Sequence, residues 1–559
     1  MFTIHHWRMN MIRMHRVGAA LLAVGLSFAP NIARAQAATQ FIGVGSSALW
    51  QTTGIAAWEL TGKLHHYTFK LTGTNVGVQD TRSSGIGYQQ GNMYIVWDNS
   101  TTPTKIYVGV SLDSTVGDRL FLGTDSSGFP AGKLILPATI PAAQNLITVT
   151  WGADDATLPA AVINDLKIND HAQRVTAAFT DIRPEDGAYQ TALARTARGT
   201  GLSSGAHTYG GLGYTGSLSA TVTNTNWIES SYSTSAFQVV PFNTHGTDPI
   251  SGAAVPTFTA YRVGFSPIIL IVNRSNASGL GAKNASGVYY FTNLTTAQVT
   301  QLWSDTTSGG CHTGAWGVSG APNVPLTVVY REPLSGTYNT FEYQAANVPY
   351  TATIASQTSQ EKNVVPTAAT GNPLNQLCSN GVGPGTRRRA IGTGEVVNTA
   401  VFGTADSIGY AFFSHGNISK LAQNASYGYL KVGNVDPIYA TYTNGLLPST
   451  TAGAVPTYAN VANGTYPYWS DLRIVTNNVA KNQTAASALA NQVIADLKSG
   501  GQLFDFLPFS STSTLYRSHY SNGTYTNGAA SNGLSGTAEN GGDVNGCVET
   551  TGNVLNCRK

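Results

Sequence analysis

Apolar runs that alternate with polar segments predict strands over 41–48, 105–112, 174–179, 266–272, 325–330, 407–413 and 471–475. Apolar positions at helical spacing predict helices over 52–60, 157–167, 186–195, 296–303, 395–402 and 484–497, the last capped by Thr484. The run from Ser266 to Val272 has almost no polar residue, which indicates a strand buried on both faces. Strands that alternate with helices predict an α/β fold built on mainly parallel sheets.

The N-terminus has the pattern of an export signal. Arg8, Arg13 and Arg16 precede a short apolar run over 17–26, and Ala33-Arg34-Ala35 ends the segment with small residues at the cleavage positions. The apolar run is shorter than the roughly 20 residues of a membrane-spanning helix. We therefore expect a signal peptide over 1–35 with no lipid-anchor cysteine, and a periplasmic or extracellular protein.

The charge of the chain changes when the signal is removed. Of the 559 residues 11% are charged and the net charge is +3. Residues 1–35 hold four Arg and no acid, so the mature chain carries −1. An apolar content of 42% argues against disorder, and the absence of a basic stripe argues against nucleic-acid binding.

Four cysteines are expected to form two disulfides after export, namely Cys311, Cys378, Cys547 and Cys557. Four cysteines allow three pairings. Cys547 and Cys557 would close a short loop in the Gly/Asn-rich tail, which leaves Cys311 with Cys378. No metal-ligand spacing accompanies them, so no metal and no cofactor are expected.

Several short motifs match known patterns without the surrounding structure that those patterns need. Gly201-Leu-Ser203-Ser-Gly205, with His207 nearby, matches a hydrolase nucleophile elbow but lacks the flanking strand and helix. The glycines over 211–216 match a nucleotide-binding loop and lack the same context. Arg387-Arg388-Arg389 is interpreted as solvated surface, with a supporting role at an anion site as the alternative. His65-His66 is assigned a surface or core role.

The ends of four predicted strands carry the most informative residues. These are Gly45-Ser46-Ser47, Asp113-Ser114-Thr115, Thr180-Asp181 and the segment from Arg331 to Thr337. Ligands of open α/β sheets lie at the carboxyl ends of strands, and helix N-termini there favour anions. Hydroxyls and one Arg are suited to an oxyanion. A buried Asp requires that the anion carry a proton, as monohydrogen phosphate does.

The segment Arg331-Glu-Pro-Leu-Ser335-Gly336-Thr337 resembles the R-x-x-G-S-G-T loop of periplasmic phosphate-binding proteins of ABC transporters. These are type II solute-binding proteins, in which two α/β lobes close on the ligand. Six further segments resemble the family in the same order, over 42–47, 178–181, 263–273, 291–304, 404–412 and 466–475. Inside the Arg loop, Pro333 and Leu334 replace the family's usual acid and glycine.

The resemblance implies a role for each matching residue. Arg331 would clamp the anion, and Ser335, Gly336 and Thr337 would donate from a helix start. Ser47 and the Ala48 amide would donate from the other lobe. Asp181 would accept the ligand's proton, which disfavours sulfate. Ser114 supplies the remaining hydroxyl, with Asp113 an equal alternative. The expected function is capture of phosphate or a similar tetrahedral oxyanion, without catalysis, for an inner-membrane ABC permease.

The resemblance also implies a domain division. Lobe 1 would comprise 36–262 plus 465–515, with insertions over 61–104, 118–170 and 196–260, and lobe 2 would comprise 263–464. A Gly/Asn-rich tail follows over 516–559, and a monomer is expected. Two alternatives stay open at this point: a secreted hydrolase such as a phosphatase, and an envelope adhesion protein that uses the inserted segments.

Overall fold

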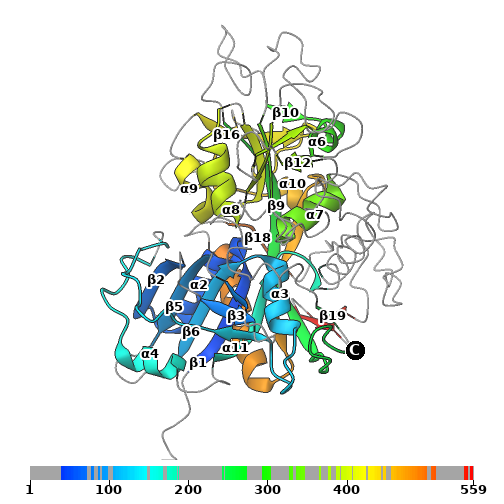
Figure 1. Cartoon of the computed structure of the whole chain (residues 1–559). Coiled ribbons are helices and arrows are strands. Elements are labelled where there is room, and N and C mark those ends of the chain that lie inside the picture. Colours follow the sequence, from blue (N-terminus) through cyan, green and yellow to red (C-terminus); the bar gives the residue numbers. More distant parts are fainter. Residues whose placement is uncertain are drawn as a thin grey trace, which may run out of the picture. The chain divides into compact units, whose positions relative to one another are not determined.

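The computed structural model of the chain is drawn in Figure 1. It describes residues 39–71, 77–80, 86–88, 91–98, 105–147, 151–167, 173–184, 187, 242–244, 246–273, 292–303, 327–331, 335–345, 364–366, 375–378, 386–390, 392–405, 407–422, 426–441, 445–448, 455–499, 505–510, 547–551 and 554–557. The predicted signal peptide over 1–35 and Cys311 lie outside these residues. In the described part of the chain, no helix combines the length and hydrophobicity needed to cross a bilayer.

One section of the sheet is built on three parallel strands. The central strand β1 (Thr39–Ser46) pairs in parallel with β6 (Ile106–Leu112) and with β8 (Ala177–Thr180). Beyond β6 the section continues with β5 (Gly91–Trp97) and β2 (His65–Leu71), which are antiparallel. Most of the described residues of the expected 61–104 insertion therefore extend the central sheet.

A second section contains the strand that ends at Arg331. Strand β11 (Thr327–Arg331) pairs in parallel with β14 (Thr386–Ala390) and β15 (Ser407–Phe412). The short β12 (Val364–Pro366), β13 (Asn375–Cys378), β10 (Asn293–Leu294) and β16 (Tyr427–Val432) complete it, and β10 pairs with β16 in parallel.

The long strand β9 (Phe258–Asn273) belongs to both sections, and all 16 of its residues are buried. Its first part pairs with β17 (Trp469–Asn477), β18 (Leu507–Pro508) and β20 (Val554–Cys557), and its last part pairs with β15 and β16, all antiparallel. The apolar run over 266–272 is therefore buried, as its composition predicts. Its neighbours in the sheet are antiparallel strands.

A helix begins within five residues of each of three of these strand ends, those of β1, β6 and β11. The helices are α2 (Ser47–Leu60), α3 (Ser114–Leu122) and α7 (Gly336–Gln344). Helix α11 (Ala480–Lys498) packs on α2. The remaining helices are α4 (Ala160–Lys167), α6 (Thr296–Trp303), α8 (Gly392–Glu395), η4 (Val396–Val401), α9 (His415–Ala422) and α10 (Ala459–Ala462).

Three sequence-based boundaries need correction. The helix expected over 52–60 begins five residues earlier, at Ser47, because Ser46 caps it. Thr484 is inside α11, where its hydroxyl donates to the Ala480 carbonyl 2.8 Å away, so it is not the N-cap. The helix expected over 395–402 is the π-helix η4, preceded by the short α8.

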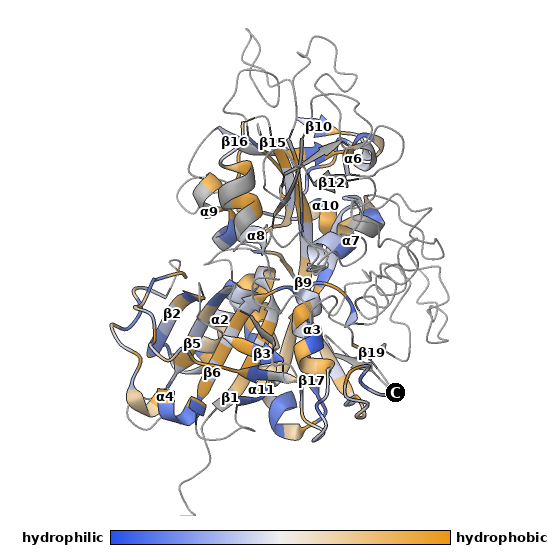
Figure 2. Cartoon of the chain, in the orientation of Figure 1, coloured by the Kyte–Doolittle hydropathy of each residue, from blue (hydrophilic) through white to orange (hydrophobic). Residues whose placement is uncertain are grey.

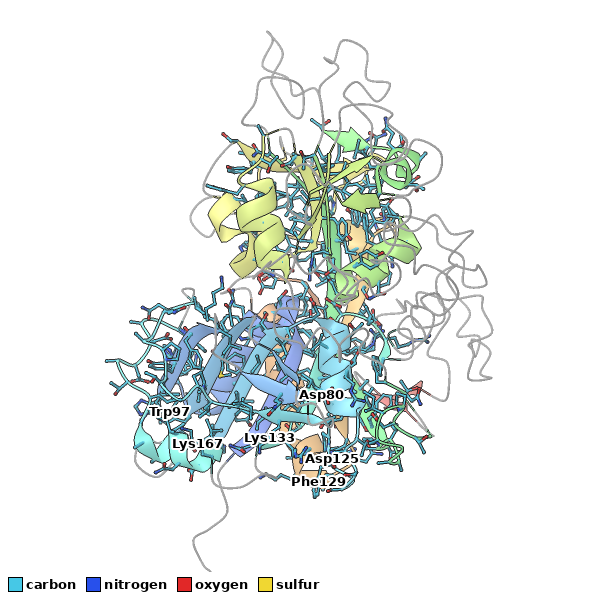
Figure 3. The ribbon with its side chains drawn as sticks, in the orientation of Figure 1. Asp80, Trp97, Asp125, Phe129, Lys133 and Lys167 are labelled. Atoms are coloured by element: carbon cyan, nitrogen blue, oxygen red, sulfur yellow. The ribbon has the colours of Figure 1, made fainter. Side chains whose placement is uncertain are left out.

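Hydrophobic residues gather on the central strands and on the helix faces that cover them (Figure 2). Around this core, polar side chains form ion pairs and hydrogen bonds. Arg174 bonds Asp125 at 2.7 Å and lies over the Phe129 ring, and both partners are labelled in Figure 3. His66 is buried, stacks on Trp151 and bonds Asp154 at 3.0 Å, which agrees with the core role assigned to it.

The C-terminal residues that the structure describes form a hairpin of β19 (Cys547–Thr551) and β20. Cys547 and Cys557 are directly opposite in its register. The shorter strands β3 (Val78–Asp80), β4 (Ile86–Tyr88) and β7 (Gly132–Leu134) form a separate three-stranded sheet. The expected boundaries of the lobes, and the disulfide pairing, remain predictions.

Candidate functional site

The carboxyl ends of β1, β6 and β8 place polar side chains at one edge of the first section. Ser46 ends β1, Asp113 and Ser114 follow β6, and Asp181 follows β8. Because these strands are parallel, their ends meet at the same edge. All four residues are buried. The parallel pairing therefore brings these strand ends together, and the role of their residues in binding stays a prediction.

Asp181 is the centre of the group. Its Oδ1 accepts a hydrogen bond from the Ser114 hydroxyl at 2.5 Å, and its Oδ2 accepts one from the Ser46 hydroxyl at 2.8 Å. Its backbone carbonyl accepts a third from the hydroxyl of Ser470 on β17, at 2.6 Å. A carboxyl group held on both oxygens and on its backbone has little freedom to turn.

Burial raises the pKa of Asp181, and the hydroxyls of Ser114 and Ser46 and the positive charge of Arg331 act in the opposite direction. Hydroxyl donors on both oxygens are suited to the ionised carboxylate, because the acid form would present a donor of its own. The site therefore stabilises the charge of Asp181 with neutral dipoles and one cation, which partly offset the cost of burial.

Helix α7 brings its N-terminus against the same carboxyl. Ser335 caps the helix, and its hydroxyl oxygen accepts the N–H of Tyr338 at 3.3 Å. A Cβ atom on Gly336 would overlap the Oδ1 of Asp181. Position 336 must therefore be glycine for the carboxyl and the first turn of α7 to be this close. The unpaired N–H groups and the dipole of a helix start favour a negative group there.

Arg331, at the end of β11, is buried and held at two points. Its Nη1 donates to the Thr393 hydroxyl at 2.9 Å, and its Nη2 donates to the Oδ1 of Asp113 at 2.9 Å. Its backbone N–H donates to the Tyr410 hydroxyl at 3.2 Å. Asp113 belongs to the first section of the sheet and Arg331 to the second, so this ion pair joins the two.

Ser47 and Ala48 have different partners. The hydroxyls of Ser47 and Thr393 are 3.1 Å apart, within hydrogen-bond distance. The Ala48 N–H donates to the Ser46 hydroxyl at 3.2 Å as part of the helix cap. Thr337 is buried in the first turn of α7. The structure thus brings Ser47, Ser114, Asp181, Arg331 and Gly336 into one connected group, flanked by Ala48, Ser335 and Thr337.

Sequence reasoning missed two members of the group and left one undecided. Ser46 was noted in the strand-end motif, yet Ser47 was selected for the site. Asp113 was an alternative for the role of Ser114, and the structure uses both. Thr393 had no signal other than a preceding glycine, Gly392, which has a φ of 71°.

The other sequence motifs are not seen in this group among the residues that the structure describes. The segments over 201–207 and 211–216 lie outside the described residues. Arg387–Arg389 are in β14, where the register sets them opposite Val328–Tyr330 of β11. Among the residues that the structure describes, no cluster of three or more His, Cys, Asp or Glu could hold a metal ion.

Comparison with family models gives one match, a PBP superfamily domain over residues 232–495. That range spans the second section, β9, all of β17 and most of α11. Comparison of the sequence with curated proteins gives no match.

Solved structures with a partly similar chain trace include the following three proteins. A putative phosphate ABC transporter substrate-binding protein with bound phosphate from Clostridium perfringens is 14% identical, with a TM-score of 0.27, over 45% of this chain and 72% of its own. A receptor for ABC-type phosphate transport from Vibrio cholerae is 16% identical, with a TM-score of 0.25, over 46% and 78%. A phosphate-binding protein from Stenotrophomonas maltophilia is 14% identical, with a TM-score of 0.31, over 81% and 82%. Similarity at this level carries no argument about a ligand.

Proposed function

We propose that this chain, which carries a PBP superfamily domain and has the α/β fold of type II periplasmic binding proteins, is an exported solute-binding protein that captures phosphate or a similar tetrahedral oxyanion. The α7 N-terminus, the buried guanidinium of Arg331 and the hydroxyls of Ser47 and Thr393 supply donors, while the Ser46 and Ser114 hydroxyls orient Asp181. Asp181 supplies the acceptor for a ligand proton. Binding requires no bond to break, so the protein is not an enzyme in this proposal.

The observation that carries the proposal is the position of Asp181. A carboxyl on the first turn of α7, between two serine hydroxyls, is surrounded by groups that also bind an oxyanion. A fully ionised anion beside it would meet a like charge. A ligand that carries a proton instead donates it to the carboxylate, which turns the repulsion into a hydrogen bond.

Arg331 supports the same ligand class. A planar guanidinium matches the spacing of two oxygens of a tetrahedral anion. Two of its nitrogens are oriented by Thr393 and Asp113, so little rotamer entropy remains to be lost on binding. Delivery of the ligand to an ABC permease, a periplasmic or extracellular location and a monomeric state are parts of the same proposal.

Isothermal titration calorimetry of the mature protein with phosphate and with sulfate tests the proposal. We expect phosphate to bind and sulfate to bind at least about a hundredfold more weakly, since sulfate leaves a buried acceptor unpaired. Absence of phosphate binding at millimolar concentration contradicts the proposal.

Asp181→Asn, with Asp155→Asn as a matched control, assigns the discrimination. Asp155 is in the same section, beside His65, away from the site. We expect the Asp181 variant to bind phosphate more weakly and to lose most of its margin over sulfate, and we expect the control to keep both. An unchanged phosphate-to-sulfate ratio in the Asp181 variant removes that residue from this role.

A further inference from the structure

Asp113 gives the site a second carboxyl group. It precedes Ser114, whose hydroxyl donates to Asp181, so the two carboxyls flank a single serine. Asp113 is 6% exposed and its Oδ1 accepts from Arg331, which is 2% exposed. The opposite charges of this buried ion pair compensate each other, so the pair as a whole carries little net charge.

The pairing with Asp113 changes how strongly the charge of Arg331 attracts an anionic ligand. A guanidinium without a counterion attracts a dianion more strongly than a monoanion, whereas a guanidinium already paired with a carboxylate adds almost no net charge. Binding of a ligand then depends mainly on hydrogen bonds. The Asp113–Arg331 pair supplies no net positive charge to balance the second negative charge of a dianion.

The other charged groups near Asp113 do not reverse this balance. On α3, Asp118 accepts from the Thr180 hydroxyl, and Arg119 is engaged by Asp80 and Asp248. After β8, Asp181 is followed by the buried Arg183. In this part of the described structure the carboxyl groups outnumber the guanidinium groups by five to three, counting Asp80, Asp113, Asp118, Asp181 and Asp248 against Arg119, Arg183 and Arg331.

We propose that Asp113 makes the site select the dihydrogen, monoanionic form of phosphate over the monohydrogen dianion. This inference rests on the proposed function. The dihydrogen form has two O–H donors, and the two carboxyls of Asp181 and Asp113 give each donor an acceptor. Its single negative charge lies on the oxygens that face the α7 N-terminus and Arg331. Asp113 is thus a specificity-determining residue that also orients Arg331.

The selection predicts a dependence of affinity on pH. Above the second ionisation of the ligand, the dihydrogen form falls tenfold for each pH unit, and the apparent Kd rises by the same factor, about tenfold per unit. Calorimetry with inorganic phosphate from pH 5.5 to 8.5 measures this slope. An apparent Kd that is constant, or that falls as the pH rises, overturns the inference and leaves phosphate capture itself intact.

Asp113→Asn separates the charge of Asp113 from its shape. The amide oxygen keeps an acceptor for Arg331, so a residue that acts as a support alone leaves the slope unchanged. We expect the variant to bind the dianion as well, so its apparent Kd should rise less steeply with pH. Above pH 8 its phosphate affinity should be at least about fivefold higher than that of wild type. The same slope in variant and wild type overturns the inference. Asp155→Asn is the matched control for loss of one negative charge.

Thiophosphate distinguishes titration of the ligand from titration of Asp181, and it needs no variant to fold. It loses its second proton at a lower pH than phosphate does. If the ligand's protonation governs binding, the midpoint of the affinity profile moves to lower pH with thiophosphate. If the midpoint stays where phosphate has it, a protein group governs the profile and the inference fails. No binding of either anion at any pH would instead contradict the proposed function.

Discussion

Gly336 and Asp181 are in such close contact that any side chain at position 336 would overlap the carboxyl oxygen Oδ1. The two residues are on different sections of the sheet, one in the first turn of α7 and the other directly after β8. The contact couples the main anion-attracting helix start to the main acceptor of the site. A substitution at either residue therefore affects the structure of both sections.

Gly336→Ala tests this coupling. The added methyl group forces the α7 N-terminus and Asp181 apart, so we expect phosphate affinity to fall by about ten- to a hundredfold, equivalent to roughly 1–3 kcal/mol of lost hydrogen bonding. The fold should persist, because alanine favours a helix. Calorimetry measures the affinity, and thermal unfolding checks the fold. Gly128→Ala is not a matched control, because Gly128 has a positive φ of 82°.

Gly416→Ala is a better comparison, since Gly416 is also in the first turn of a helix, α9, and a Cβ there would meet the flexible side chain of Gln51. We expect this variant to bind phosphate far better than Gly336→Ala. Equal losses in the two variants would mean that tightness at any helix start, and not the Asp181 contact, controls affinity.

Asp496 on α11 makes the stability of the protein depend on pH. Burial, followed by its hydrogen bond with Glu59 of α2, raises the pKa of Asp496 to about 7. A carboxyl with a raised folded-state pKa stabilises the fold in its protonated form, so this contribution is present at low pH and is lost as the pH rises through about 7. The carboxyl ionises near pH 3.8 in the unfolded chain, so we expect the melting temperature to fall between about pH 4 and pH 7 and to level off above that.

Asp496→Asn removes that titration and keeps a polar group between α2 and α11. Its melting temperature should exceed that of wild type at pH 8.5 by roughly 1–3 °C, a modest effect because Asp496 is partly exposed, and should be similar at about pH 4. A part of the slope remains, since burial also raises the pKa of Asp505 to about 7. A variant less stable than wild type at pH 8.5 contradicts the assignment.

The C-terminal hairpin carries the remaining prediction. The register of β19 and β20 sets Cys547 opposite Cys557. A disulfide between directly opposite strand positions closes a short loop and stabilises the hairpin by reducing the freedom of the unfolded chain. In the exported protein we expect a non-reducing peptide map to contain the linked pair of peptides. Free thiols at both positions, or a link of either residue to Cys378, would contradict the predicted pairing.

Much of the fold could be predicted because it follows from local patterns. The buried strands and the polar residues that follow β1, β6 and β11 are continuous in sequence and carry their own signals. The errors occurred at boundaries, as at Thr484, where a polar residue that resembles a cap is inside the helix and bonds Ala480. Short-range patterns do not determine which of two adjacent polar residues is the cap.

The sequence by itself determined the residue types of the site and the strand ends that carry them, because composition and spacing encode secondary structure and its chemistry. The tertiary structure decided the partners. Asp113 and Arg331 are 218 residues apart in the chain, and Ser47 and Thr393 are 346 apart. Whether Ser46 or Ser47 meets Asp181 depends on how α2 leaves β1, and whether Arg331 has a counterion depends on how the two sections of the sheet meet. Residues this far apart in the sequence come into contact only when the chain folds, and short-range sequence patterns do not predict which of them will meet.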